Sequence, residues 1–128
     1  MSTRRVLAVV PDLFFATRIA ATAKQQGVEL ELVPAARAVA RLAESPGALV
    51  LVELQAPGAC ALVRELKAAG ATAVVGFYPH TDVAIRKAAI EAGADAVLPR
   101  SQFVTRLVPL LTHGLAALKF QDAGEGSP

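Results

Sequence analysis

Short apolar runs recur along the chain and alternate with stretches of helical spacing. The runs are a few residues long and mostly continuous, which is typical of strands covered on both faces of a sheet. They occupy residues 6–10, 49–52, 73–77 and, more briefly, 96–98. Residues 28–33 alternate only weakly between apolar and polar positions, and we expect an edge strand there.

Five stretches with apolar residues at three- and four-residue spacing predict helices over residues 13–26, 34–44, 59–69, 82–92 and 102–118. Gly27, Gly70 and Gly93 each follow such a stretch, where a left-handed residue commonly ends a helix. Pro109 falls inside the last stretch and should kink or divide that helix. Repeated strand-plus-helix units predict an α/β fold with a doubly wound parallel sheet.

The length of 128 residues fits one domain, which we place at residues 1–120. Residues 121–128 are small and polar, so we expect a disordered C-terminal tail. Cys60 is the single cysteine, which excludes an internal disulfide and a multi-cysteine metal site. We expect Cys60 to be a small packed apolar residue.

Charge and composition argue against several classes of partner. The net charge is +2, the basic residues are scattered, and aromatic residues make up 5% of the chain, so we do not expect nucleic-acid binding. No segment approaches the roughly 20 apolar residues of a membrane span. The first apolar run is broken by Pro11 and Asp12, which is unlike a signal peptide, and we expect a cytoplasmic protein. A hydrophobic fraction of 54% leaves apolar surface for a protein partner.

In open parallel sheets the functional crevice lies beyond the carboxyl ends of the strands. The residues at those positions are Pro11, Asp12, Glu53, Tyr78 and Arg100. The sequence contains no Gly-rich phosphate loop, no dinucleotide fingerprint and no Gly-x-Ser-x-Gly motif. We therefore predict that the protein is not an enzyme and has no cofactor and no metal site.

Residues 49–58 and 88–100 resemble two parts of response-regulator receiver domains, the aspartyl-phosphate domains of two-component signalling. The first stretch resembles the third strand with its Pro-Gly loop, and the second resembles the fourth helix and fifth strand. The likeness extends from about residue 6 to residue 111. It implies a five-stranded, receiver- or flavodoxin-like parallel sheet with strand order 2-1-3-4-5.

The same resemblance shows where the phosphorylation chemistry departs from the family pattern. The acidic pair that helps to bind magnesium reads Pro11-Asp12, and the phosphoacceptor aspartate is replaced by Glu53. The longer glutamate side chain places its carboxylate one methylene further out, which disfavours in-line phosphoryl transfer. The switch threonine or serine aligns with Tyr78, and the switch aromatic aligns with Val97.

The family's lysine after the fifth strand aligns with Arg100. A guanidinium suits a bidentate bond to a carboxylate, so we hypothesise that Arg100 pairs with Glu53 and holds this end of the sheet in one state. An ordinary rim salt bridge is the competing interpretation. Asp12 can also act as the N-cap of the helix that begins at Leu13.

With a degenerate phosphoacceptor pocket, function is expected on the surface. Phe14 and Phe15 point about 100° apart on the first helix, and we expect Phe14, which shares a face with Arg18, to be partly exposed. In receivers this helix docks phosphotransfer partners, and the fourth helix, fifth strand and fifth helix form a dimer or output face. The corresponding candidates here are Ile85, Arg86, Ala89, Val97 and Arg106.

We interpret the chain as a stand-alone pseudo-receiver, a phosphorylation-independent protein-protein interaction module in bacterial signalling. Its partner would be another signalling protein, or itself in a homodimer through the second face. One alternative is an atypical receiver that accepts phosphate in a phosphorelay. Another is a flavodoxin-like small-molecule-binding domain, which a pocket lined by Phe14, Tyr78 and His80 would favour.

Overall fold

The computed structural model describes residues 5–79 and 82–118 of the chain. All five predicted strands are present, with ends within about two residues of the expected ones. They are β1 (Arg5–Val9), β2 (Glu29–Leu32), β3 (Leu49–Glu53), β4 (Ala73–Tyr78) and β5 (Ala96–Pro99). The helices are α1 (Leu13–Gln25), α2 (Ala35–Glu44), α3 (Ala59–Ala68), α4 (Val83–Ala92), α5 (Arg100–Thr105) and α6 (Leu107–His113).

The strands form one parallel sheet in the order β2-β1-β3-β4-β5, as the sequence predicts. In register, Val6 lies between Leu30 of β2 and Leu49 of β3, and Glu53 lies opposite Phe77 of β4. The weakly alternating β2 and the short β5 are the two edge strands. All strands therefore point their carboxyl ends toward the same edge of the sheet.

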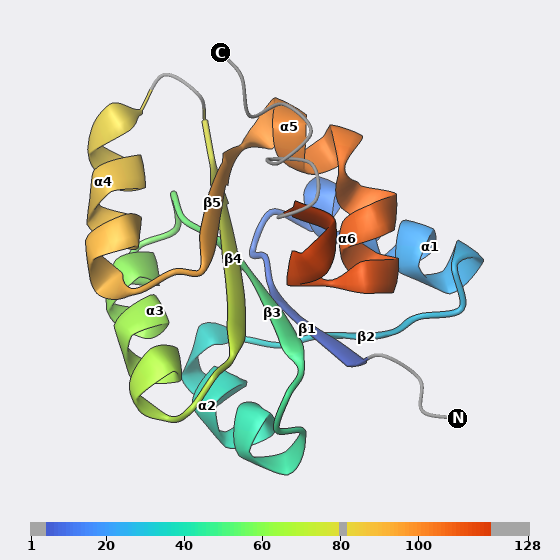
Figure 1. Ribbon diagram of the computed structural model, residues 1–128, viewed down its shortest axis with the longest axis horizontal. Coiled ribbons are helices and arrows are strands. Elements are labelled where there is room, and N and C mark those ends of the chain that lie inside the picture. The colour runs from blue at the N-terminus through green and yellow to red at the C-terminus, as the bar shows by residue number, and fades with distance from the viewer. Residues whose placement is uncertain (1–4, 80–81, 119–128) are drawn as a thin grey trace.

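Helices cover both faces of the sheet (Figure 1). The helices α2, α3 and α4 lie on one face, and α1, α5 and α6 lie on the other. Successive residues of a strand pack into two separate cores. In β1, Leu7 and Val9 pack toward α2–α4, whereas Val6 and Ala8 pack toward α1, α5 and α6. A strand buried on both faces needs apolar side chains at every position, which explains the continuous runs.

Three phenylalanines form the centre of the core beneath α1 and α5. The ring centroids of Phe15 and Phe77 are 4.9 Å apart, and those of Phe77 and Phe103 are 4.4 Å apart. The first separation is in the range that aromatic pairs prefer, and the second, between nearly parallel rings, lies at its lower limit. The cluster joins α1, β4 and α5 below the carboxyl edge of the sheet.

The last predicted helix is divided, as the position of Pro109 indicates. α5 ends at Thr105 and α6 begins at Leu107, with Arg106 between them. Pro109 lies four residues after Thr105, so in a continuous helix its ring would clash with the Thr105 carbonyl. In the first turn of a new helix its missing N–H is not needed.

Gly76 of β4 lies directly under the side chain of Leu54. A Cβ at position 76 would lie 2.6 Å from Leu54 Cδ1, closer than such atoms approach in proteins. Leu54 is buried, and its N–H donates to the Phe77 carbonyl at 2.9 Å. The absence of a side chain at position 76 therefore allows the residue after Glu53 to pack onto the sheet.

Gly27, Gly70 and Gly93 have φ angles of 70°, 99° and 105°, so the predicted left-handed ends of the helices are confirmed. Cys60 is partly buried and packs against the core on the α2–α4 face. None of the described helices has the length and apolar character needed to cross a bilayer. The predicted domain boundary at residue 120 and the tail 121–128 lie outside the described residues.

Candidate functional site

Four of the predicted site residues lie at the carboxyl edge of the sheet. Glu53 and Tyr78 are the last residues of β3 and β4, and Arg100 begins α5 directly after β5. Asp12 lies between β1 and α1. The sheet topology places these four residues on one edge, but each side chain contacts different groups of the protein.

The Glu53 carboxylate is held inside the protein by the backbone after β1. Its side chain is the one buried charged group of the described residues, with an exposed fraction of 7%. The backbone N–H of Asp12 donates to Glu53 Oε1 at 3.1 Å. A buried carboxylate needs such donors to offset the loss of water. Glu53 therefore links the end of β3 to the loop between β1 and α1.

Asp12 is the N-cap of α1, as one of its predicted roles requires. The backbone N–H of Phe15 donates to Asp12 Oδ1 at 3.2 Å, and the Asp12 backbone is extended with φ −67° and ψ 110°. This bond satisfies one of the N–H groups that a helix start leaves without an intrahelical acceptor. The carboxylate therefore supports the helix next to the crevice.

These residues do not fit a magnesium ion. Mg²⁺ requires near-octahedral oxygen coordination, usually with one or two carboxylates and several waters. Pro11 supplies no carboxylate, and one oxygen each of Asp12 and Glu53 already accepts a backbone hydrogen bond. Among residues 5–79 and 82–118, no group of three His, Cys, Asp or Glu side chains is placed to hold a metal ion. No step of a mechanism can therefore be assigned to a metal at this edge.

The predicted ion pair between Glu53 and Arg100 is wrong. Within the described residues these two side chains form no ion pair, and the Arg100 guanidinium carbon lies 4.8 Å from the Phe15 ring centroid and 5.9 Å from that of Phe77. A planar, weakly hydrated guanidinium is stabilised on aromatic faces. Glu53 meanwhile satisfies its carboxylate with a backbone amide. The sequence reasoning paired two opposite charges and overlooked the aromatic cluster beneath them.

Tyr78 turns toward the other core. It is 5% exposed and packs with the buried residues on the α2–α4 face, including Ala89. It also contributes to a cavity of about 400 Å³ together with Arg86, Val97 and Arg106. Tyr78 therefore connects the carboxyl edge to the predicted second interaction face.

The start of α1 presents the most exposed large apolar side chains of the described residues. Phe14 is 91% exposed and Leu13 is 77% exposed, whereas Phe15 is buried beside Ile19. The prediction for Phe14 is confirmed, and Arg18 is also exposed one turn further on. Leu13 was missed, although the polar Thr17 one turn later was a signal that this side of the helix faces solvent.

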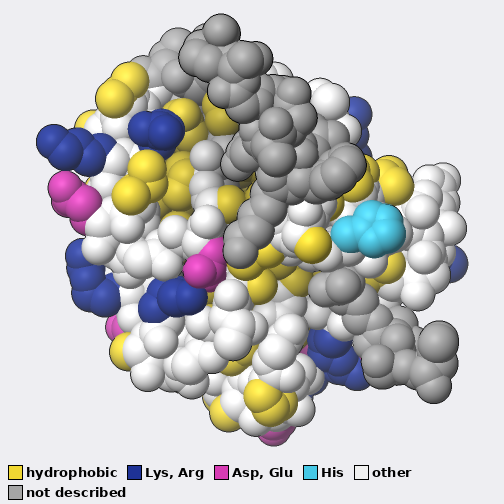
Figure 2. Space-filling view, in the orientation of Figure 1, with side chains coloured by type: hydrophobic (Ala, Val, Ile, Leu, Met, Phe, Trp, Pro, Cys, Tyr) yellow, Lys and Arg dark blue, Asp and Glu magenta, His cyan; other side chains and the backbone are white. Residues whose placement is uncertain are grey.

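The second predicted face is only partly available to a partner. Arg86 is exposed, and Ile85 and Val97 are partly buried against the core. Arg106 is likewise of intermediate exposure. Ala89 is fully buried, because it lies with Ala92 on the side of α4 that packs against the core, so the assignment of Ala89 to a surface is wrong. On the face shown in Figure 2, hydrophobic side chains gather between α4 and β5, with Lys and Arg side chains beside them.

A cavity of about 610 Å³ lies at the carboxyl edge on the α1 and α5 side. It is lined by Phe15, Arg18, Gln55, Arg100 and Ser101, among others. This is not the pocket of Phe14, Tyr78 and His80 that would have favoured a small-molecule domain, and His80 lies outside the described residues. Sequence reasoning missed this cavity because its polar side chains come from separate segments with no local pattern.

Comparison with protein-family models gives no match, and comparison with curated proteins gives none either. Solved structures do match. The signal receiver domain of a putative LuxO repressor protein from Vibrio parahaemolyticus is 21% identical over 98% of this chain and 99% of that chain, with a TM-score of 0.73. The receiver domain of NtrX from Brucella abortus is 21% identical over 87% of this chain and 98% of that chain, with a TM-score of 0.73.

A response regulator from Thermotoga maritima is 14% identical, and the match covers 84% of this chain and 99% of that one with a TM-score of 0.67. The strand order and the helices on both faces agree with these structures. The fold is therefore the receiver fold, as the resemblance implied. At these identities the likeness shows the fold, and the chemistry must be argued from the side chains.

Proposed function

We propose that the protein is a stand-alone pseudo-receiver, a cytoplasmic signalling module that binds other proteins without being phosphorylated. The observation that carries this proposal is the bond from the Asp12 amide to the buried Glu53 carboxylate at 3.1 Å. Glu53, which aligns with the phosphoacceptor, makes an internal contact, and Asp12 caps α1. An edge organised in this way has no need of phosphate to be held in one arrangement.

The binding surfaces that support the proposal are the two faces flanking this edge. Leu13 and Phe14 project from the start of α1, where exposed apolar groups of this size are typical of a protein contact. Arg86 and Val97 belong to the face of α4 and β5, which is the proposed contact for a second signalling protein or a second copy of the chain. The Glu53 contact holds the loop that leads into α1, so it also positions the first surface.

Phosphorylation can be tested directly with acetyl phosphate and magnesium. We expect no mass increase of one phosphoryl group in the parent protein, and no amide-shift change on addition of beryllofluoride with magnesium. The variant P11D/E53D restores an acidic pair and a shorter acceptor, and it serves as the positive control for recovered chemistry. A hydroxylamine-sensitive phosphate on Glu53 of the parent would refute the proposal and favour the atypical receiver.

Partner binding is tested by affinity capture with the parent, Phe14→Asp and Arg86→Glu, in buffer containing a magnesium chelator. We expect a specific protein to be retained by the parent and lost with one of the two variants, which also identifies the face. Both side chains are exposed, so the variants should keep the circular dichroism and unfolding midpoint of the parent. Binding that appears only with magnesium and a phosphodonor would contradict phosphate independence.

A further inference from the structure

The cavity at the α1 and α5 side of the carboxyl edge has the composition of a ligand site. Its volume of about 610 Å³ lies within the range of about 300–1,000 Å³ that small-molecule sites occupy. Phe15 and Val104 contribute apolar surface, and Gln55 and Ser101 contribute side chains that form hydrogen bonds. An apolar wall with a few polar groups is the usual arrangement in such sites.

The charge of this lining is one-sided. Arg18 and Arg100 both line the cavity, and no acidic residue does. Among the described residues neither guanidinium has a carboxylate partner, in contrast to Arg5 and Arg41, which are both ion-paired. Two cations without a carboxylate partner at one cavity favour an anion, and the desolvation cost without compensation falls on the partly buried Arg100, since Arg18 is exposed.

The position of Arg100 strengthens the case. The guanidinium is fixed over the Phe15 ring at 4.8 Å, so little side-chain freedom remains to be lost when an anion binds. Its Nε is buried and has no hydrogen-bond partner in the described part of the chain. Buried donors without an acceptor are rare in proteins, and an oxyanion is the acceptor that a guanidinium prefers.

We propose that this cavity binds a small organic anion that has one carboxylate or phosphate head and an apolar body. The head pairs with Arg100 and Arg18, and the apolar body lies against Phe15 and Val104. Gln55, which follows β3, and Ser101 of α5 add hydrogen bonds from the two sides. Occupation of the site requires neither magnesium nor a covalent phosphate.

The test is a titration of the full chain with four probes, followed by ¹H–¹⁵N chemical shifts: benzoate, phenyl phosphate, inorganic phosphate and benzamide. We expect saturable binding of benzoate or phenyl phosphate, with the largest shifts at Phe15, Gln55, Arg100 and Ser101. Neutral benzamide and inorganic phosphate should each bind at least about tenfold more weakly, since one lacks the charge and the other lacks the apolar body. Equal binding of benzamide or of inorganic phosphate would overturn the proposal.

Arginine variants locate the site. Arg18→Gln and Arg100→Gln should each weaken binding of the aromatic anion by about tenfold. Arg64→Gln is the matched control, because Arg64 is exposed on α3 and does not line the cavity, and it should change binding by less than about twofold. Arg18 is exposed, so Arg18→Gln keeps the test valid if Arg100→Gln unfolds. Equal weakening by Arg18→Gln and Arg64→Gln, or no saturable binding of either aromatic anion, would show that the inference is wrong.

Discussion

The side chain at position 53 reaches a backbone amide that belongs to another segment of the chain. Glu53 accepts the N–H of Asp12, and Asp12 in turn accepts the N–H of Phe15. The two bonds connect β3 to the first turn of α1 through successive donors and acceptors. The two acidic side chains at this edge of the receiver fold therefore make structural hydrogen bonds within the protein.

Replacement of Glu53 measures how much its hydrogen bond with the Asp12 amide contributes to the free energy of unfolding. Glu53→Ala leaves the Asp12 amide without its acceptor, and we expect the free energy of unfolding to fall by about 1–3 kcal/mol. Glu53→Gln keeps a carbonyl oxygen at a similar position and should lose less than about 1 kcal/mol. Urea denaturation of both variants and the parent gives these differences. Equal stability of the parent and Glu53→Ala would show that the bond contributes nothing.

Some residue positions could be predicted from the sequence, and others could not. The N-cap role of Asp12 and the exposure of Phe14 could be predicted, because both depend on neighbours within one helical turn. The position of Arg100 could not, because Phe15 and Phe77 reach it from distant parts of the chain. Opposite charges at aligned positions were therefore a poor guide to contact.

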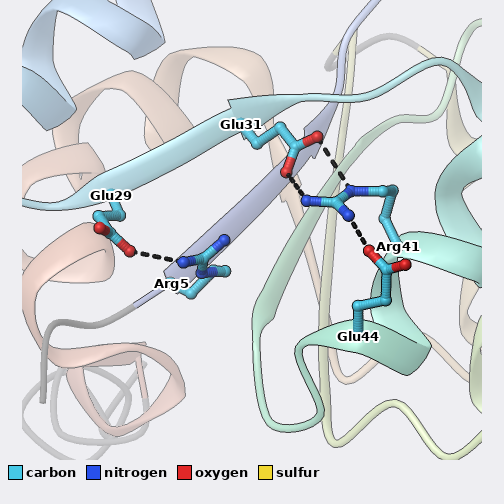
Figure 3. Close-up of polar contacts among 5 residues, drawn as sticks. All are labelled: Arg5, Glu29, Glu31, Arg41 and Glu44. Carbon is cyan, nitrogen blue, oxygen red and sulfur yellow. Dashed lines mark hydrogen bonds and ion pairs between the residues drawn. The ribbon is translucent and has the colours of Figure 1, made fainter.

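At the scale of elements, the edge strand β2 is the least apolar part of the sheet. It is joined to β1 by the ion pair of Arg5 and Glu29 at 2.8 Å, and to α2 by Arg41, which donates through Nη2 and Nε to the two oxygens of Glu31 at 2.7 and 3.0 Å (Figure 3). Arg41 also pairs with Glu44. Charged side chains on an edge strand discourage pairing with a strand of another molecule.

These ion pairs make stability depend on pH. The hydrogen bond from Arg41 lowers the pKa of Glu31 below 4.5, although partial burial opposes this shift. Because the pKa is lower in the folded state, the contribution is present above pH 4.5 and is lost as the pH falls through the lowered value. Arg41→Gln should therefore destabilise the protein more at about pH 7 than at about pH 3.

The urea midpoints of parent and Arg41→Gln at these two pH values provide the measurement. Arg37→Gln on the same helix is the control, because Arg37 is exposed and forms no ion pair within the described part of the chain. The difference for Arg41 should also shrink in high salt, since both partners are partly exposed. A deficit that is the same at both pH values would exclude the ion pair as its cause.

For the whole molecule, two cores meet at a sheet whose central strands are apolar on both faces. β1, β3 and β4 are each paired on both sides, and β2 and β5 on one side only. Such an arrangement predicts that stability is greatest at the centre and decreases toward both edges.

Native-state hydrogen exchange should follow this gradient. Among hydrogen-bonded amides, we expect those of β1, β3 and β4 to exchange only through global unfolding, whereas those of β2 and β5 exchange faster through local opening. Measured protection factors for each strand test the order. Amides of β2 that are as protected as those of β3 would contradict it.

Much of the fold could be predicted because apolar runs, helical spacing and glycine positions are local signals that agree with one another. The continuous run at residues 49–52 requires two covered faces, and the structure has them. The cavity beside Arg18 and Arg100 could not be predicted, because its lining comes from α1, α5 and the segments that follow β3 and β4. Local patterns determine the elements, and the shape of a site depends on distances between them.

The contact of Leu54 with Gly76 has a consequence for how this sequence can vary. Even a methyl group at position 76 would occupy the space of the Leu54 side chain, which follows Glu53 directly. Positions 54 and 76 therefore constrain each other sterically, so that a larger residue in β4 requires a smaller one after β3. Any redesign of the carboxyl edge therefore has to choose the residues at positions 54 and 76 together.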